Sequence, residues 1–302
     1  MNSEGKIRLA ILALILANVI WGAAFPIYKW TLDIIPPFTF SFLRFFLGAF
    51  ILLPFVWNRL NIEKQDILRL IFLSFVSVTV LIPLLLVGLT LTPSINAPII
   101  VSSGPIFLIV ASILFLKEKV RPKILLGTVI SLAGVLLIIL RPIIEAGFSG
   151  GILGNLFIFL ATLCSVIQAI LLKKLTVKND PLAITFWMFV IGSLPLIPAV
   201  LWESQNFNFG LLNTQGIIGL SYGVILASAF AHFLLAYGIK YIKASEVGIF
   251  TYVDPIATVV IAVPLLSEVI TPVYLVASFL VFAGIFVAEG RIHYHPFQKL
   301  RA

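Results

Sequence analysis

Ten long stretches of apolar residues follow one another along the chain, separated by short segments that carry most of the charged residues. The stretches cover approximately residues 7–29, 37–57, 67–90, 94–116, 122–140, 151–172, 181–202, 214–238, 245–266 and 271–289. A helix needs roughly 20 apolar residues to cross the hydrocarbon core of a bilayer. The pattern therefore predicts an all-α integral membrane protein with ten transmembrane helices.

The second half of the chain repeats residues of the first half at a nearly fixed distance. Four residues recur 150 positions later: Pro105, Glu118, Pro122 and Gly134 correspond to Pro255, Glu268, Pro272 and Gly284. Nearer the start the distance is 144, which pairs Lys29 with Lys173 and Pro37 with Pro181. We expect the six additional residues in the longer loop around residues 203–213. The constant spacing of these residue types indicates an internal duplication rather than chance similarity between apolar helices.

A duplicated unit of five spans must enter the membrane in two opposite orientations. Inverted repeats of this kind are typical of secondary transporters, whose substrate site lies between the two copies. We therefore predict two inverted five-helix repeats around a central cavity, at residues 1–140 and 151–290. Residues 141–150 are expected to form an external linker, and residues 291–302 a cytoplasmic tail.

The composition agrees with a membrane protein, because 61% of the residues are hydrophobic and only 11% are charged. A soluble domain is about half apolar and a quarter charged. The net charge of +8 could indicate nucleic-acid binding, but 17 of the 20 Lys and Arg residues fall in segments on one side of the expected topology. The positive-inside rule makes that side cytoplasmic. We therefore predict a multi-pass protein of the cytoplasmic membrane with both termini inside, whose basic residues lie beside anionic lipid and bind no nucleic acid.

Several short patterns resemble the EamA family of the drug/metabolite transporter superfamily. They are Asn18-x-x-Trp21-Gly22-x-x-Phe25-x-x-x-Lys29, Phe42-Leu43-Arg44-Phe45, Gly104-Pro105, Phe115-Leu116-Lys117-Glu118-Lys119-Val120 and Gly127…Gly134. The resemblance covers residues 7–289 and departs from the family pattern at Lys117, where a glycine is usual, and after Glu268, where a basic residue is usual. It implies that helices 1–4 and 6–9 surround the cavity. It also implies transport of amino acids, other small metabolites or drugs, often as export.

Asp254 is the first candidate for substrate contact. It lies about ten residues into the ninth span, which places it near the bilayer midplane. Pro255 follows it and interrupts the hydrogen-bond ladder of the helix, so that carbonyl groups can face a cavity. An ionisable group within a span is a functional hypothesis by default. Asp254 can bind a substrate amine, a cation or a proton, or it can serve as a structural carboxylate.

Two further ionisable residues lie within spans. Arg44 in the second span can hold a substrate carboxylate in a bidentate pair, but its match to the family pattern favours a structural or gating role. His232 in the eighth span can relay protons or can simply bond to a neighbouring helix. Pro105 and Pro255 are candidate hinges. Glu118 and Glu268 end spans four and nine and are predicted to be structural or gating residues.

Uncharged polar side chains form a second group of candidates for lining the cavity. They are Asn18, Trp21, Asn96, Ser102, Ser103, Gln168, Tyr222 and Tyr252. For any one of them, a hydrogen bond that joins two helices is at least as good an explanation. Tyr252 and Ser102 occupy equivalent positions of the two repeats, as do Asp254 and Gly104, so the copies differ at the expected site.

The sequence favours a secondary transporter over the other classes of membrane protein. It contains no GxxxxGK[ST] pattern for an ATP-driven pump, and no HExxH or paired-cysteine site for a membrane enzyme. We therefore expect no cofactor, no metal and no catalytic residue. A lipid flippase or a membrane-embedded enzyme on the same scaffold is the alternative. The identity of the solute, proton coupling and the oligomeric state are left open.

Overall fold

The computed structural model describes residues 3–104, 106–107, 122–146, 152–208, 210, 212–241 and 248–289. Within these residues the regular structure is entirely helical. Seven helices are long and apolar enough to cross a membrane: Gly5–Leu32, Pro37–Arg59, Lys64–Leu91, Leu125–Glu145, Ile152–Leu172, Pro181–Glu203 and Thr214–Gly238. Two shorter apolar helices follow at Phe250–Leu266 and Pro272–Val287. The described chain is therefore a multi-pass membrane protein.

The first part of the chain forms long helices, several of which change type along their length. Its elements are α1 (Ser3–Leu32), α2 (Pro37–Val56), the 3₁₀ turns η1 (Trp57–Arg59) and η2 (Lys64–Asp66), α3 (Ile67–Ser74), the π-helix η3 (Phe75–Val80), α4 (Leu81–Leu91), α5 (Asn96–Ser102) and α7 (Pro122–Ala146). Pro37 is the first residue of α2, a position whose N–H has no partner within the helix, so the absence of an N–H in proline has no consequence there. Lys117 and Glu118 lie outside the described residues, as does Pro105.

The second part contains a comparable series of helices, again with a π-helix between two α-helices. It consists of α8 (Ile152–Leu175), α9 (Pro181–Ser193), the 3₁₀ turn η4 (Leu194–Leu196), α10 (Ile197–Glu203), α11 (Thr214–Ser221), the π-helix η6 (Tyr222–Phe230), α12 (Ala231–Tyr241), the 3₁₀ helix η7 (Gly248–Val253), α14 (Asp254–Leu266) and α15 (Pro272–Glu289). Prolines again stand at the start of α9 and α15. Asp180 caps α9, because its carboxylate accepts from the backbone N–H groups of Leu182 and Ala183.

The six additional residues of the second part lie in the expected loop. The second span of each part, Pro37–Arg59 and Pro181–Glu203, has 23 residues. The next spans begin at Lys64 and Thr214, so the connection has 4 residues in the first part and 10 in the second. The difference of six therefore falls in the loop that follows Glu203, as the sequence predicted.

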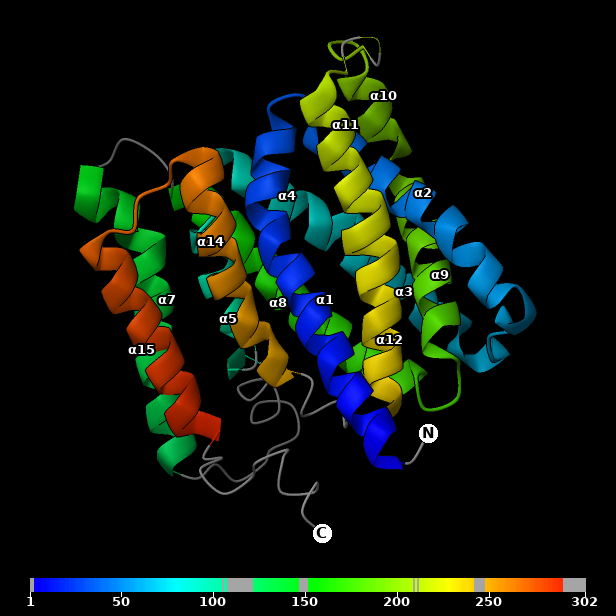
Figure 1. Ribbon diagram of the computed structural model, residues 1–302, viewed down its shortest axis with the longest axis horizontal. Helices are drawn as coiled ribbons and strands as arrows, with labels where there is room; N and C mark the ends of the chain where they lie inside the picture. Colours follow the sequence, from blue (N-terminus) through cyan, green and yellow to red (C-terminus); the bar gives the residue numbers. More distant parts are fainter. Residues whose placement is uncertain are drawn as a thin grey trace.

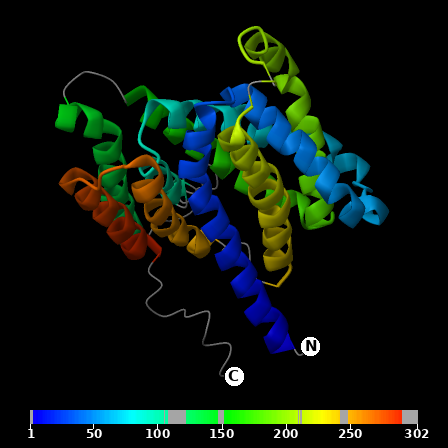
Figure 2. The same cartoon turned by 45° about the horizontal axis from the view of Figure 1, so that its top comes forward.

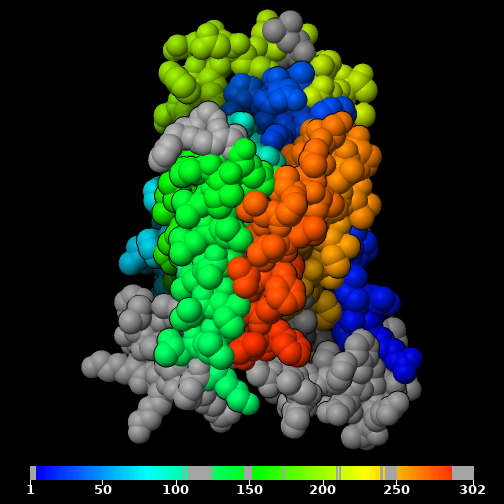
Figure 3. Space-filling view, turned by 90° about the vertical axis from the view of Figure 1, so that its left-hand side faces the viewer, coloured from blue at the N-terminus to red at the C-terminus, as the bar shows by residue number. Residues whose placement is uncertain are grey.

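Helices α7 and α15 pack side by side along their lengths (Figures 1 and 3). Glycines bring their backbones close together: a Cβ atom on Gly134 would lie 2.7 Å from the Ala277 carbonyl oxygen and from the Val281 nitrogen. A Cβ atom on Gly284 would lie 2.3 Å from the nitrogen of Ser131 and 2.5 Å from the carbonyl oxygen of Gly127. The contact therefore depends on residues without side chains at both positions.

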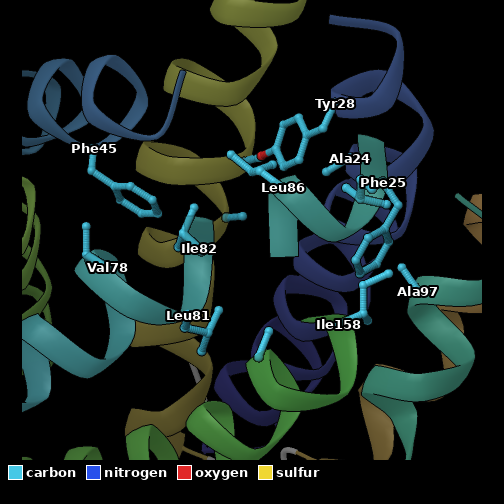
Figure 4. Packing of buried hydrophobic residues seen from close by; sticks show 14 of the residues in the cluster. Ala24, Phe25, Tyr28, Phe45, Val78, Leu81, Ile82, Leu86, Ala97 and Ile158 are labelled. Carbon is cyan, nitrogen blue, oxygen red and sulfur yellow. The ribbon is translucent and has the colours of Figure 1, made fainter. Parts of the chain in front are cut away.

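Helix α1 occupies the middle of the molecule, between α14 on one side and α12 on the other (Figures 1 and 2). Gly22 packs against the backbone of Asp254, and Leu14 packs against Gly238. The core between α1, α2, α4 and α8 is apolar, and Tyr28 on α1 lies beside Leu86 of α4 within it (Figure 4). Polar side chains that enter this core consequently need partners within the protein.

Candidate functional site

A buried arginine lies where α1, α2, α9, η6 and α12 meet. We call the group around it the arginine cluster, which consists of Trp21, Tyr28, Arg44, Phe45, Phe189, Ser228 and His232. Arg44 is 4% exposed, and its Nε donates to the Ser228 hydroxyl oxygen at 2.8 Å. Its guanidinium carbon stands 4.6 Å from the centre of the Tyr28 ring and 4.7 Å from that of Phe45. These distances are within the range of cation–π attraction.

Aromatic rings continue from Arg44 to His232. The rings of Phe45 and Phe189 meet edge to face at 4.8 Å, and Phe189 meets His232 at 5.1 Å. The Trp21 ring also meets His232 edge to face, at 5.2 Å. The His232 Nδ1 lies 2.9 Å from the Ser228 carbonyl oxygen. The cluster thus combines one cation with apolar walls, and it brings together three residues that the sequence nominated separately: Trp21, Arg44 and His232.

Asp254 lies apart from the arginine cluster, on the opposite side of α1. It begins α14 directly after the 3₁₀ helix η7, so the expected interruption of the ninth span is present at this position. Its side chain is 5% exposed, and its Oδ1 accepts no hydrogen bond from the described residues. Thr258 donates to the Gly22 carbonyl oxygen at 2.7 Å and also lies 2.8 Å from that of Asp254, which fixes α14 against α1. The carboxyl group therefore retains an unused acceptor within the bundle.

A second polar group involves residues near the ends of α1, α7 and α14. These helix ends lie at the end of the bundle remote from the start of α1 (Figure 1). We call this group the polar end cluster, which consists of Lys29, Thr92, Asn96, Arg141, Glu145, Asn155, Glu268 and Thr271. Glu268 accepts from the backbone N–H groups of Ser94 and Ile95 at 2.6 and 2.9 Å. The Lys29 ammonium donates to the Thr92 carbonyl oxygen at 2.6 Å and lies 3.6 Å from Glu268. Glu268 thus joins three segments of the chain.

Asparagine and arginine side chains extend the polar end cluster across to α7 and α8. Thr92 donates to the Asn155 side-chain oxygen at 2.7 Å, and Asn96 donates to the same oxygen at 3.2 Å. The Arg141 guanidinium donates to the Asn96 side-chain oxygen at 2.8 Å and to Glu145 at 2.9 Å. The two polar atoms of the Asn96 side chain are therefore both bonded within the protein.

The remaining predicted site residues belong to neither cluster. Tyr222 donates to the Ile20 carbonyl oxygen at 2.7 Å, and Trp21 of the arginine cluster donates to the Ala227 carbonyl oxygen at 2.9 Å, so both join helices. Ser103 donates to the Ile100 carbonyl oxygen, whereas the buried Ser102 hydroxyl and the Asn18 side-chain oxygen have no hydrogen bond to a described residue.

On the remaining spans, Gln168 is half-buried on α8, Tyr252 packs edge to face on Phe282 at 6.0 Å, and Pro255 stands in the first turn of α14. Pro105 and Glu118 lie outside the described residues.

Sequence reasoning missed several members of the two clusters. Tyr28 and Ser228 surround Arg44, and Asn155 and Thr92 connect to Asn96, yet none was a candidate. Their only signal was polarity within an apolar run. Arg141 was not a candidate either, although it bonds to Asn96 inside the bundle.

Apolar helices long enough to cross a membrane surround these buried polar groups. The comparisons with known proteins identify the family. The sequence profile of the EamA-like transporter family matches residues 8–140 and again residues 152–289. An uncharacterized transporter of Archaeoglobus fulgidus is 26% identical over 296 residues, which cover 97% of this chain and all of the relative. The uncharacterized transporter YetK of Bacillus subtilis is 27% identical over 286 residues, covering 92% of this chain and 86% of YetK.

The chain belongs to the EamA-like transporter family. A protein crystal structure with 15% sequence identity has the same fold, with a TM-score of 0.64 over 95% of this chain and 99% of its own. The resemblance predicted from the short sequence patterns is confirmed, and the molecule is a membrane transporter.

Proposed function

We propose that this chain is a secondary transporter that exports small organic solutes, amino acids among them, across the cytoplasmic membrane by alternating access. The two halves, residues 1–140 and 151–290, form inverted five-helix units in this proposal, with both termini in the cytoplasm. The family profile matches once in each half, which supports a duplication. Solute passes between the halves, where inverted-repeat transporters bind their substrates.

The contact between α7 and α15 is the observation that carries the inverted arrangement. Gly134 meets residues 277 and 281, and Gly284 meets residues 127 and 131. The two contacts are equivalent, because adding 150 to positions 134, 127 and 131 gives positions 284, 277 and 281. Such reciprocal contacts arise when two equivalent units face each other across a two-fold axis. Residue numbers rise along one helix as they fall along the other, so the helices are antiparallel. A two-fold axis that relates antiparallel spans lies in the membrane plane, which inverts one unit relative to the other.

Two other pairs of contacts support the same relation. Gly88 packs against Ile158, and their counterparts Gly238 and Leu14 pack against each other. Phe45 and Phe189, which are 144 positions apart, meet ring to ring, as residues beside the two-fold axis would. The arginine cluster contains this ring pair and, in this proposal, lies at the junction between the two halves.

The polar end cluster connects the two halves at the proposed external end. Glu268 and Asn155 belong to the second half, and they hold the backbone or side chains of Thr92, Ser94 and Asn96 in the first. For solute to leave at this end, these hydrogen bonds must break. In the proposed cycle, the polar end cluster therefore holds the external side closed until the halves rock apart.

Reporter fusions test the inverted topology. A reporter fused after Lys64 or Lys178 should be cytoplasmic, and one fused after Glu145 or Asn208 should be external. The reason is the partition of basic residues between the two sides of the membrane. A cytoplasmic reporter after Glu145 would contradict the inversion, because five spans would then return to the side on which they began.

Flux measurements distinguish transport from the other activities that the scaffold could support. The pure protein in liposomes should exchange solutes and return them chemically unchanged. A membrane enzyme would instead alter the compound, and a flippase would move labelled phospholipid between leaflets. Either of these results without solute exchange would replace the proposal.

A further inference from the structure

We propose that Arg44 and Tyr28 form a binding site for the carboxylate of a transported solute whose remaining part is apolar. This inference rests on the proposed function and names the class of substrate. It depends on how the two side chains are placed in the arginine cluster and on which of their polar atoms are unused.

The Arg44 guanidinium is only partly satisfied by the protein. It carries five N–H donors, and the Nε donor is bonded to Ser228. No carboxylate among the described residues lies within ion-pair distance of it, and its Nη1 and Nη2 donate to no described residue. A buried charge without a counter-ion is costly. The remaining two nitrogens present the planar fork that binds a carboxylate in bidentate fashion.

Tyr28 provides a second unused donor beside the guanidinium. Its ring lies directly against the Arg44 guanidinium carbon, and its hydroxyl oxygen is buried with no hydrogen bond to a described residue. Most buried polar groups in proteins are hydrogen-bonded, so an exception calls for an explanation. A carboxylate, which only accepts hydrogen bonds and can take several, would satisfy both Tyr28 and Arg44.

The walls of the arginine cluster determine what accompanies the carboxylate. Phe45, Phe189 and Trp21 present aromatic rings, and the cluster itself contains no acidic side chain. A solute with an aliphatic or aromatic group can pack on these rings, whereas a cationic amine would lie near the Arg44 charge without a counter-ion. The site therefore favours apolar monocarboxylates over amines of the same shape.

The place of the cluster in the bundle is an independent reason for a ligand. Phe45 and Phe189 are equivalent positions of the two parts of the chain and touch each other, so the cluster lies where these parts meet. Arg44 is 4% exposed, hence the site is closed in this conformation. Solute would enter when the halves separate, and closure would then desolvate the ion pair and strengthen it.

Binding measurements on the full-length chain in nanodiscs test the proposal. The probes are 3-phenylpropionate, its uncharged analogue 3-phenylpropanamide and the cation 3-phenylpropylamine, with 4-methylpentanoate as a second apolar carboxylate. Isothermal titration should show the carboxylate binding at least about tenfold more tightly than the amide, because a hydrogen bond to a charged group is lost in the amide. Equal affinity for 3-phenylpropionate and the amide, tighter binding of the amine, or no binding of either carboxylate at millimolar concentration would overturn the proposal.

Three variants locate the effect. Arg44→Gln should weaken 3-phenylpropionate binding by roughly 10- to 100-fold and change binding of the amide by less than about threefold. Tyr28→Phe removes only the hydroxyl oxygen and should weaken carboxylate binding about tenfold, because one hydrogen bond to the carboxylate is lost. This variant keeps the test decisive if Arg44→Gln does not fold. Arg59→Gln, at an arginine whose side chain is 64% exposed, is the matched control and should bind normally. Carboxylate preference that survives both substitutions in the cluster would overturn the proposal.

Exchange assays separate this inference from the proposed function. If liposomes with the protein exchange amines but not carboxylates, the carboxylate site is wrong and the transport function stands. If Arg44-dependent carboxylate binding is present but no solute is exchanged, the site stands and the transport function is wrong.

Discussion

Replacing Glu268 by Gln should release the polar end cluster without changing the size of the side chain. The two carboxylate oxygens accept from Ser94 N and Ile95 N at 2.6 and 2.9 Å, and Lys29 lies 3.6 Å away. In Gln an NH₂ group replaces one carboxylate oxygen. This NH₂ group would face a backbone N–H and cannot accept from it, so one charge-assisted hydrogen bond is lost. Such a bond contributes about 2 kcal/mol, which corresponds to roughly a 30-fold change in an equilibrium constant. The closed external end should become less favoured by that factor.

A cysteine reporter measures this change. Ser94, whose backbone N–H bonds to Glu268, is fully buried. A cysteine at this position, Ser94→Cys in a Cys164→Ser background, can therefore react with a membrane-impermeant maleimide only when the external end opens. The rate of that reaction reports the opening. When reaction follows rapid opening, the rate is proportional to the population of the open state. We expect labelling in the Glu268→Gln variant to be roughly 30-fold faster, up to the limit at which the open state predominates.

The matched control is Asp66→Asn near the other end of the bundle. Asp66 is also a buried carboxylate, and it accepts from Asn179 at 3.0 Å and from Arg69 at 2.9 Å. Its neutralisation should destabilise the fold by a similar mechanism but leave the labelling of Cys at position 94 unchanged. An unchanged rate in Glu268→Gln, or an equal increase in Asp66→Asn, would refute the role of Glu268 in closing the external end.

Three further substitutions test the packing and the ninth span. Gly284→Ala places a methyl group 2.3 Å from a backbone nitrogen of α7 and should lower the free energy of unfolding by about 1–3 kcal/mol, which is measured as a lower unfolding temperature. Gly210→Ala, at an exposed position, is the control and should leave the unfolding temperature unchanged. Asp254→Asn should fold normally but lose most transport or its pH dependence in liposome flux assays, and full flux with an unchanged pH profile would leave Asp254 a structural role. Pro255→Ala should slow exchange without lowering the unfolding temperature, and an unaltered exchange rate would show that the break between η7 and α14 is not used as a hinge.

The sequence predicted the seven long apolar helices of the described residues well, because several of their ends carry clear chemical signals. Proline at positions 37, 181 and 272 opens α2, α9 and α15, as expected for residues without an N–H. Apolar composition over some 20 residues then defines the spans themselves. The change from η7 to α14 falls at Asp254 and Pro255, where the sequence predicted an interruption of the ninth span.

The rotation of each span could not be predicted, and with it the composition of the site. In a soluble protein, polar residues mark the outward face of a helix, but in a bilayer both faces are apolar and the periodic signal is lost. On α15, for example, Phe279 is exposed while Ala277 and Val281 are buried, although all are apolar. Hence Arg44 could be nominated alone, but its partner Ser228, which lies 184 residues later, could not be found from the sequence.

Counterflow in proteoliposomes tests the central claim, that this chain is a solute carrier working by alternating access, most directly. Liposomes with the pure protein are loaded with an excess of unlabelled 3-phenylpropionate, amino acids and amines and diluted into trace amounts of the same labelled solutes. A carrier that exposes its site to one side at a time should accumulate at least one label transiently above its external concentration and return it chemically unchanged. Folded protein that produces no transient accumulation with any of these solutes, or that returns the label as a different compound, would contradict the account.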